Sequence, residues 1–172
     1  MNTKVKDMVI LAFLTAILLV GQVGMAFLHN IEVVSLLIII YTLLFRKKVF
    51  YIIYIFAFLE GMIYGFGIWW FMYLYVWTIL AVITMLCSKN DSPVMWSIIS
   101  GAFGLGFGFL CSFPYFIISG VGGGIAYWIS GIPSDILHCV GNVVITLVLF
   151  KPVYGILSKL TSRYYQRAVT HS

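Results

Sequence analysis

Charged residues are scarce in this sequence of 172 residues, where only 9% are Asp, Glu, Lys or Arg and 63% are hydrophobic. A typical soluble domain carries about 25% charged residues, so the composition excludes one. About six membrane spans of ~20 apolar residues each would use most of the chain. No segment is then left for a soluble catalytic or nucleotide-binding domain. The sequence therefore predicts one integral membrane domain over residues 1–172, and it excludes a self-contained ATPase, dehydrogenase or DNA-binding protein.

Cysteine is also rare, and Cys87, Cys111 and Cys139 show no CxxC spacing. Their odd number argues against a disulfide framework, so we interpret them as small packing residues. A cleavage site of small residues is missing as well after the apolar run that follows Lys4 and Lys6. That run is therefore predicted to be a retained first span and not a removed signal peptide.

Lys and Arg are absent from most of the chain, because all ten of them fall in four clusters. The apolar stretches between clusters are long enough to cross the membrane out and back. Under the positive-inside rule all four clusters are cytoplasmic. The net charge of +5 is thus a topology signal and no sign of nucleic-acid binding. The clusters are Lys4 with Lys6, residues 46–48, Lys89, and Lys151 with Lys159, Arg163 and Arg167.

Six transmembrane helices are predicted, in a compact all-α bundle with both termini in the cytoplasm. The stretch 113–132 is apolar and rich in glycine, which is unfavourable for a loop in water. We expect it to form a lid or re-entrant segment over the outer mouth. Pro133 suits the first position of the last helix, and residues 151–172 form a basic cytoplasmic tail. The predicted spans are 8–28, 33–45, 49–64, 69–87, 94–112 and 133–150.

Three ionisable side chains lie within the predicted spans: Glu60, Asp135 and His138. Such groups are costly inside a bilayer and are candidates for function. Counted from the nearest basic cluster at ~1.5 Å per residue, Glu60 and His138 lie ~18 and ~20 Å into a hydrocarbon core ~30 Å thick. Tyr73 and Trp77, counted in the same way, lie ~24 and ~18 Å deep. Polar and aromatic groups of three spans therefore converge in the outer half of the membrane.

The spacing of these residues predicts a binding pocket. Asp135, His138 and Asn142 fall at i, i+3 and i+7, within about 60° of one helical face. Aromatic rings with a few acceptors and one imidazole suit a small, flat, polar molecule. Two carboxylates without a nearby Lys or Arg favour a neutral or cationic heterocycle over an anion. The predicted substrate-binding residues are Glu60, Tyr64, Trp69, Tyr73, Trp77, Trp128, Asp135, His138 and Asn142.

Other interpretations of the same residues stay open. An aromatic belt at the membrane surface would also account for Trp69, Trp70 and Trp128. A hydrogen bond between helices would account for Glu60 and His138. One His and two carboxylates without HxxxH spacing are a weak metal signal, and we expect neither a metal nor a cofactor. Ser134 with Asp135 and His138 supplies the groups of a catalytic triad, but proximity along one helix does not establish one.

Small residues recur at two places within the predicted spans. The glycine-rich stretch 101–108 superficially resembles a phosphate-binding loop, but no Lys follows it and no strand precedes it. Close packing of helices is the better interpretation. In the first span Ala12 and Ala16, four residues apart, leave a shallow groove that another helix can approach closely.

Taken together, several short segments resemble the S component of an energy-coupling factor (ECF) transporter. S components are the small six-helix membrane subunits that bind substrate during vitamin uptake in bacteria and archaea. The resemblance covers nearly the whole chain, from the first span to the end of the last. The segments that carry it are Ala12 with Ala16, Leu59–Gly61, Tyr64–Trp70, Gly131–Asp135, and Gly141 with Asn142.

The resemblance implies an uptake function without catalysis. The face with Ala12 and Ala16 would dock on a transmembrane T component, which carries two ATPase subunits on its cytoplasmic side. The chain would capture its substrate at the outer face of the cell membrane of a bacterium or archaeon. It would then topple in the membrane and release the substrate inside. It would itself hydrolyse nothing, so we do not expect an enzyme.

The resemblance also implies a substrate class. A thiamine-specific S component uses Glu, His, Asn and Trp around its ligand, which is a chemical likeness to Glu60, His138, Asn142 and Trp128. A thiamine-type, pyrimidine or pyridine vitamin or vitamin precursor is therefore the expected substrate. Alternatives from other classes are an intramembrane enzyme, a structural membrane subunit without a ligand, and a self-sufficient secondary transporter.

Overall fold

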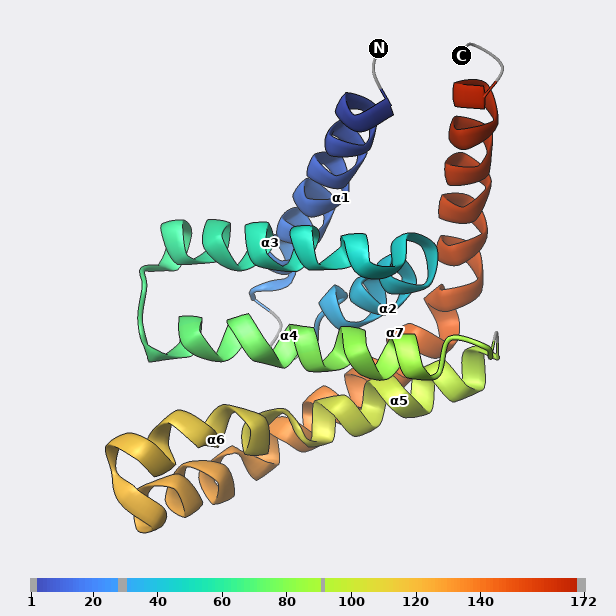
Figure 1. Ribbon diagram of the computed structural model, residues 1–172. Coiled ribbons are helices and arrows are strands. Elements are labelled where there is room, and N and C mark those ends of the chain that lie inside the picture. Colours follow the sequence, from blue (N-terminus) through green and yellow to red (C-terminus); the bar gives the residue numbers. More distant parts are fainter. Residues whose placement is uncertain (1–2, 28–30, 91, 170–172) are drawn as a thin grey trace.

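The structure is a computed structural model that describes residues 3–27, 31–90 and 92–169. It is about 90% helical, and no strand occurs within the described ranges. This confirms the predicted all-α class. The elements in chain order (Figure 1) are α1 (Thr3–Met25), α2 (Val34–Phe45), the 3-10 helix η1 (Arg46–Lys48), α3 (Val49–Tyr64), α4 (Ile68–Leu86), α5 (Pro93–Leu105), α6 (Phe107–Ile118) and α7 (Gly120–Val169).

Three predicted spans coincide with helices to within one residue: 33–45 with α2, 49–64 with α3 and 69–87 with α4. α1 begins before the predicted first span, whose predicted end at Leu28 lies outside the described residues. The chain has the all-α architecture of a membrane protein. Within the described ranges, the segments long and apolar enough to cross a bilayer are Val5–Met25, Ile68–Leu86, Pro93–Ile118 and Gly120–Arg163.

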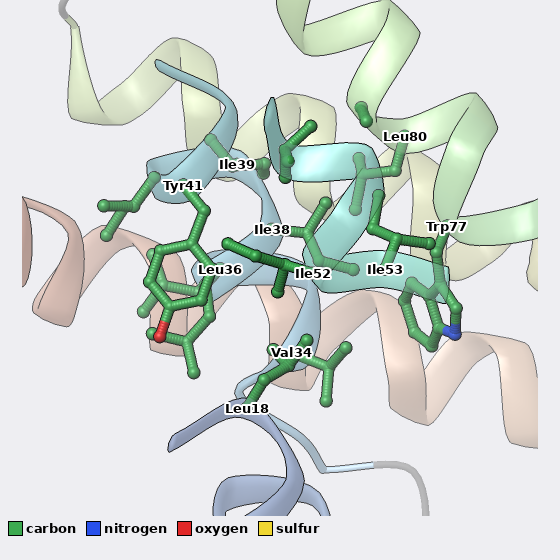
Figure 2. Close-up of a cluster of buried hydrophobic side chains, with 14 of the residues drawn as sticks. Leu18, Val34, Leu36, Ile38, Ile39, Tyr41, Ile52, Ile53, Trp77 and Leu80 are labelled. Carbon is green, nitrogen blue, oxygen red and sulfur yellow. The ribbon is translucent and has the colours of Figure 1, made fainter. Parts of the chain in front are cut away.

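α2 is the centre of the bundle. Ten of its 12 residues are buried, and it packs against α1, α3, α4, α5 and α7. Its residues are apolar on every side, which is typical of a helix enclosed by others. In Figure 2 Ile38 and Ile39 of α2 lie close to Ile52 and Ile53 of α3 and to Leu80 of α4. At ~1.5 Å per residue α2 is ~18 Å long, shorter than a hydrocarbon core of ~30 Å.

The predicted fifth span, 94–112, is divided in two. α5 ends at Leu105, Gly106 separates it from α6, and α6 continues past Pro114 to Ile118. The predicted end before Pro114 was wrong. A proline is tolerated inside a membrane helix when neighbouring helices, side chains or a local change in the turn satisfy the freed backbone groups.

The segment 113–132, predicted as a lid, is helical over almost its whole length. α6 ends at Ile118, Ser119 follows, and α7 begins at Gly120 with φ 69°. That positive φ is readily adopted only by glycine, and it lets the chain reverse within two residues. α6 and the first part of α7 therefore form a helical hairpin, the lower pair of helices in Figure 1.

α7 is one long helix from Gly120 to Val169, with Pro133 and Pro152 inside it. The prediction that the last span begins at Pro133 was therefore wrong. The predicted tail, 151–172, is helical as far as Val169, where the description ends. Sharp bends in helices occur mostly at prolines, and Figure 1 shows α7 bent, with its last part turned away from α5.

Glycines bring α5 close to α7. A Cβ atom at Gly104 would lie 2.9 Å from the carbonyl carbon of His138, and one at Gly101 would overlap the side chain of Val143. Side chains at these two positions would force the helices apart. The interpretation of these glycines as a helix-packing surface is confirmed.

Two polar contacts join helix ends that are far apart in the sequence. Lys48 Nζ lies 2.6 Å from Asp7 Oδ2, which joins the start of α3 to the first turns of α1. Arg46 donates a hydrogen bond of 2.6 Å to Ser88 Oγ, just beyond α4. The connection between α2 and α3 and the end of α4 therefore lie at the same end of the bundle as the start of α1.

Candidate functional site

A cavity of about 370 Å³, here called the aromatic pocket, opens where five helices meet. Its size falls in the range of small-molecule sites, ~300–1,000 Å³. The lining comes from α1, the loop before α2, α3, α4, α6 and α7. It consists of Gln22, Met25, Ala26, Ile31, Glu32, Glu60, Tyr64, Trp69, Tyr73, Trp77, Phe107 and His138. The structure thus brings together six of the nine predicted site residues: Glu60, Tyr64, Trp69, Tyr73, Trp77 and His138.

One wall of the aromatic pocket is a continuous row of rings. Trp69, Tyr73 and Trp77 follow one another at each turn of α4, with ring centroids 5.2 and 5.5 Å apart in edge-to-face contact. Phe107 of α6 extends the row, 5.7 Å from Trp77 and 5.0 Å from the imidazole of His138. Such contacts favour a fixed arrangement of the rings.

Two polar groups in this pocket are buried without a protein partner. Glu60 is only 2% exposed, and its Oε1 has no hydrogen-bond partner among the described residues. The same holds for Nε1 of Trp77, a residue that is also 2% exposed. Figure 2 shows Trp77 at the edge of the apolar cluster, with its nitrogen pointing away from the aliphatic side chains. In the pocket wall, α3 thus carries a buried acceptor and α4 a buried donor.

His138 is paired with Glu32, a residue that sequence reasoning did not include in the site. Its Nε2 lies 3.1 Å from Glu32 Oε1. The Glu32 carboxylate also accepts hydrogen bonds from the backbone N–H and the hydroxyl of Ser35, at 2.9 and 2.6 Å, in the first turn of α2. The alternative of a direct Glu60–His138 bond is not what the structure shows. Glu32 is one of only five acidic residues, and this scarcity was the available signal.

Asn142 lies behind the aromatic pocket and not in its lining. It is 1% exposed, and its side-chain nitrogen donates to Ser35 Oγ at 3.2 Å and to the carbonyl of Ser100 at 3.1 Å. Through Ser35 it is linked to Glu32 and so to His138. Asn142 therefore links α7 to α2 and α5 by hydrogen bonds next to the Glu32–His138 pair.

Asp135 belongs to a second cavity, of about 270 Å³, between the two arms of the α6–α7 hairpin. We call it the hairpin cavity. Its lining consists of Phe107, Gly108, Cys111, Tyr127, Ser130, Gly131, Ser134, Asp135 and His138. Asp135, His138 and Asn142 are all at most 5% exposed, as their spacing predicts. They nevertheless lie against different cavities. Asp135 lines the hairpin cavity, His138 lines both cavities, and Asn142 lines neither.

Trp128 lies away from the aromatic pocket. It is 38% exposed, and its ring contacts Phe109 with centroids 5.1 Å apart. No residue of 113–132 lines the aromatic pocket, while Tyr127, Ser130 and Gly131 line the hairpin cavity. The expectation that this segment covers the substrate pocket is therefore not met in the structure.

Ala12 and Ala16 are both exposed on the outward face of α1. Phe13, Ile17 and Val20 are exposed on the same helix, at 66, 37 and 70%. The predicted small-residue groove thus lies on an apolar surface that the rest of the chain leaves uncovered.

Comparisons with known proteins add no relative. No protein-family model matches the chain, and neither a curated protein nor a solved structure is significantly similar to it. Within the described ranges, no cluster of three or more His, Cys, Asp or Glu side chains is placed to hold a metal ion.

Proposed function

We propose that this chain is the substrate-binding subunit of an ECF-type vitamin uptake transporter. It captures a small vitamin or vitamin precursor at the outer face and delivers it inward together with a T component and two ATPase subunits. It binds without catalysing a reaction. The observation that carries this proposal is the aromatic pocket, lined by Glu60 and Trp77, whose buried polar atoms have no partner among the described residues.

The chemistry of the pocket supports a heterocyclic substrate. Leaving a buried donor or acceptor unsatisfied costs about 1–3 kcal/mol, so a ligand that pairs with both orphan atoms gains affinity. Such a ligand offers an N–H to Glu60 and an acceptor to the indole of Trp77. Its flat face packs on Trp69 and Tyr73. Among the described residues, no Lys or Arg lines the pocket, which favours a neutral or cationic pyrimidine, pyridine or thiamine-type compound.

The positions of the charged helix ends support an outward-facing pocket. Asp7, Lys48 and Ser88 lie at one end of α1, α3 and α4, and their contacts place the basic segment 46–48 at this end. The aromatic pocket is lined by residues at the opposite ends of the same helices, such as Tyr64 and Trp69. If the basic end is cytoplasmic, the pocket faces outward. With this orientation, we propose six crossings and both termini in the cytoplasm of a bacterial or archaeal cell.

The exposed face of α1 supports a docking role. Small residues four apart allow two membrane helices to approach closely, and Ala12 and Ala16 occupy such positions on an uncovered surface. We assign this face to the T component.

The proposal is tested by thermal unfolding of the detergent-purified chain with a panel of vitamins and their precursors. A ligand that binds only the native state raises its stability by about 2.7 kcal/mol at 100 times Kd. We expect a large shift with one pyrimidine, pyridine or thiamine-type compound, and a much smaller shift for the Glu60→Gln protein. A panel without any stabilising compound contradicts the proposal and favours the structural subunit without a ligand.

A further inference from the structure

The hairpin cavity contains a carboxylate oxygen without a partner. Asp135 is 5% exposed, and its Oδ1 accepts a hydrogen bond of 3.0 Å from the backbone N–H of Gly108. Its Oδ2 has no hydrogen-bond partner in the described parts of the chain. A Cβ atom at position 108 would overlap the carboxylate, so glycine is required there. The hairpin is thus built to hold this carboxylate against the backbone of α6.

Asp135 forms no ion pair with another described residue. Among the described residues, no Lys or Arg lines the hairpin cavity. The basic group that does line it, His138, has its Nε2 engaged by Glu32 on the side of the aromatic pocket. A buried carboxylate with neither a counter-ion nor a full set of hydrogen bonds is strongly unfavourable. A cation that enters the cavity removes this penalty.

The size and walls of the cavity favour an organic cation. A volume of about 270 Å³ corresponds to roughly nine water molecules at ~30 Å³ each, far more than one bare metal ion occupies. Phe107 and Tyr127 supply aromatic surface, and Tyr127 is stacked on Tyr115 with ring centroids 4.1 Å apart. Cations of the ammonium type bind well against aromatic faces.

We propose that the hairpin cavity is a second binding site, separate from the aromatic pocket, for a small organic cation of the ammonium or amidinium type. Asp135 Oδ2 accepts its N–H groups, and Phe107 and Tyr127 contact its apolar part. Phe107 and His138 form the partition between the two cavities, since they line both. The proposal concerns a cavity other than the proposed substrate pocket, so it does not depend on the uptake function.

The test is isothermal titration of the full chain in detergent with benzylammonium chloride. Neutral benzyl alcohol, which has nearly the same size, is the matched control ligand. We expect benzylammonium to bind the native chain at least tenfold more tightly than benzyl alcohol. Asp135→Asn, which keeps the shape but removes the charge, lowers the affinity for benzylammonium at least tenfold.

A second variant keeps the test decisive if Asp135→Asn does not fold. Gly131 lines the cavity, and a Cβ atom there meets nothing within 4 Å. Gly131→Leu therefore places a large apolar side chain in the cavity while it retains the Asp135 carboxylate, and Leu suits a helix interior better than Gly. We expect it to abolish benzylammonium binding. Thr146→Val is the control, because Thr146 is a buried polar residue of the same helix that lines neither cavity.

Three results would overturn the proposal. One is the absence of benzylammonium binding, and another is equal binding of benzyl alcohol. The third is binding that Glu60→Gln removes while Asp135→Asn and Gly131→Leu retain it, which would place the probe in the aromatic pocket. None of these results affects the vitamin screen, so failure of the second site is distinguishable from failure of the proposed function.

Discussion

The aromatic pocket and the hairpin cavity share one wall but are built in different ways. Each contains a buried carboxylate with an unpaired oxygen, Glu60 in the first and Asp135 in the second. The aromatic pocket takes its lining from five helices and a loop, whereas the hairpin cavity is formed by α6 and α7 alone. The first therefore depends on the packing of the whole bundle, and the second on one hairpin.

The lining of each cavity accounts for a different ligand. Large rings along α4 create a flat wall in the aromatic pocket, next to one donor and one acceptor. In the hairpin cavity, Gly108 and Gly131 leave room beside a lone carboxylate. The same functional group thus favours a heterocycle in one place and a simple cation in the other.

The largest loss of stability is expected from a substitution in the contact between α5 and α7, because α7 lines both cavities. Gly104→Ala places a Cβ atom 2.9 Å from the backbone of His138, and overpacking of this kind costs about 1–3 kcal/mol. Because α7 must shift, both cavities should lose their ligands. Thermal unfolding and the two binding assays measure this. Gly131→Ala, whose Cβ meets nothing within 4 Å, is the control and should be as stable as the native chain or more so. Equal stability of the two variants would contradict the close contact of α5 and α7.

A double-mutant cycle on the partition tests which acid His138 contacts. Hydrogen bonds to charged groups contribute about 1.5–3 kcal/mol, so Glu32→Ala and His138→Ala should show a coupling energy of at least ~1 kcal/mol. The cycle of Glu60→Ala with His138→Ala should stay within ~0.5 kcal/mol of additivity. Chemical unfolding of the native chain, the three single variants and the two double variants gives both coupling energies. A larger coupling for Glu60 would restore the alternative in which Glu60 and His138 join two helices.

The aromatic pocket should be sensitive to Glu60 and indifferent to Trp128. For the compound found in the vitamin screen, Glu60→Ala should raise Kd at least tenfold, which is about 1.4 kcal/mol. Trp128→Phe should leave Kd unchanged, because Trp128 does not line the pocket. Titration of the compound into both variants measures the two Kd values. Equal losses in the two variants would show that the binding site extends as far as Trp128 on the hairpin, beyond the lining of the aromatic pocket.

The smallest effect on the isolated chain is expected from the outer face of α1. Ala12→Leu combined with Ala16→Leu should change neither stability nor binding in either cavity, since both residues are exposed. The same pair should prevent copurification with the T component, because larger side chains fill the groove. The matched control is Val20→Leu, a change on the same helix with little change in size. Copurification of the double variant as efficient as that of the native chain would contradict the docking role of this face.

Local pattern was enough to predict much of the fold. The bounds of α3 follow from an apolar run between Lys48 and Gly65, and α2 and α4 were located equally well. The hairpin was missed, because its glycines and Pro133 are typical of loops and helix starts when taken by themselves. Neighbouring helices satisfy the backbone in a way that local sequence does not record.

The sequence by itself determined that the chain is an all-α membrane-like protein. It also determined which face of the last helix carries Asp135, His138 and Asn142. Apolar runs and helical periodicity are local properties that can be recognised in the sequence. Six of the residues predicted from them line one pocket. The tertiary structure alone decided that His138 pairs with Glu32, that Asp135 faces a different cavity, and that Trp128 lies apart. Residues within about 60° of one another on a helix can face different neighbours. Which neighbour each one meets depends on the crossing and rotation of helices distant in sequence.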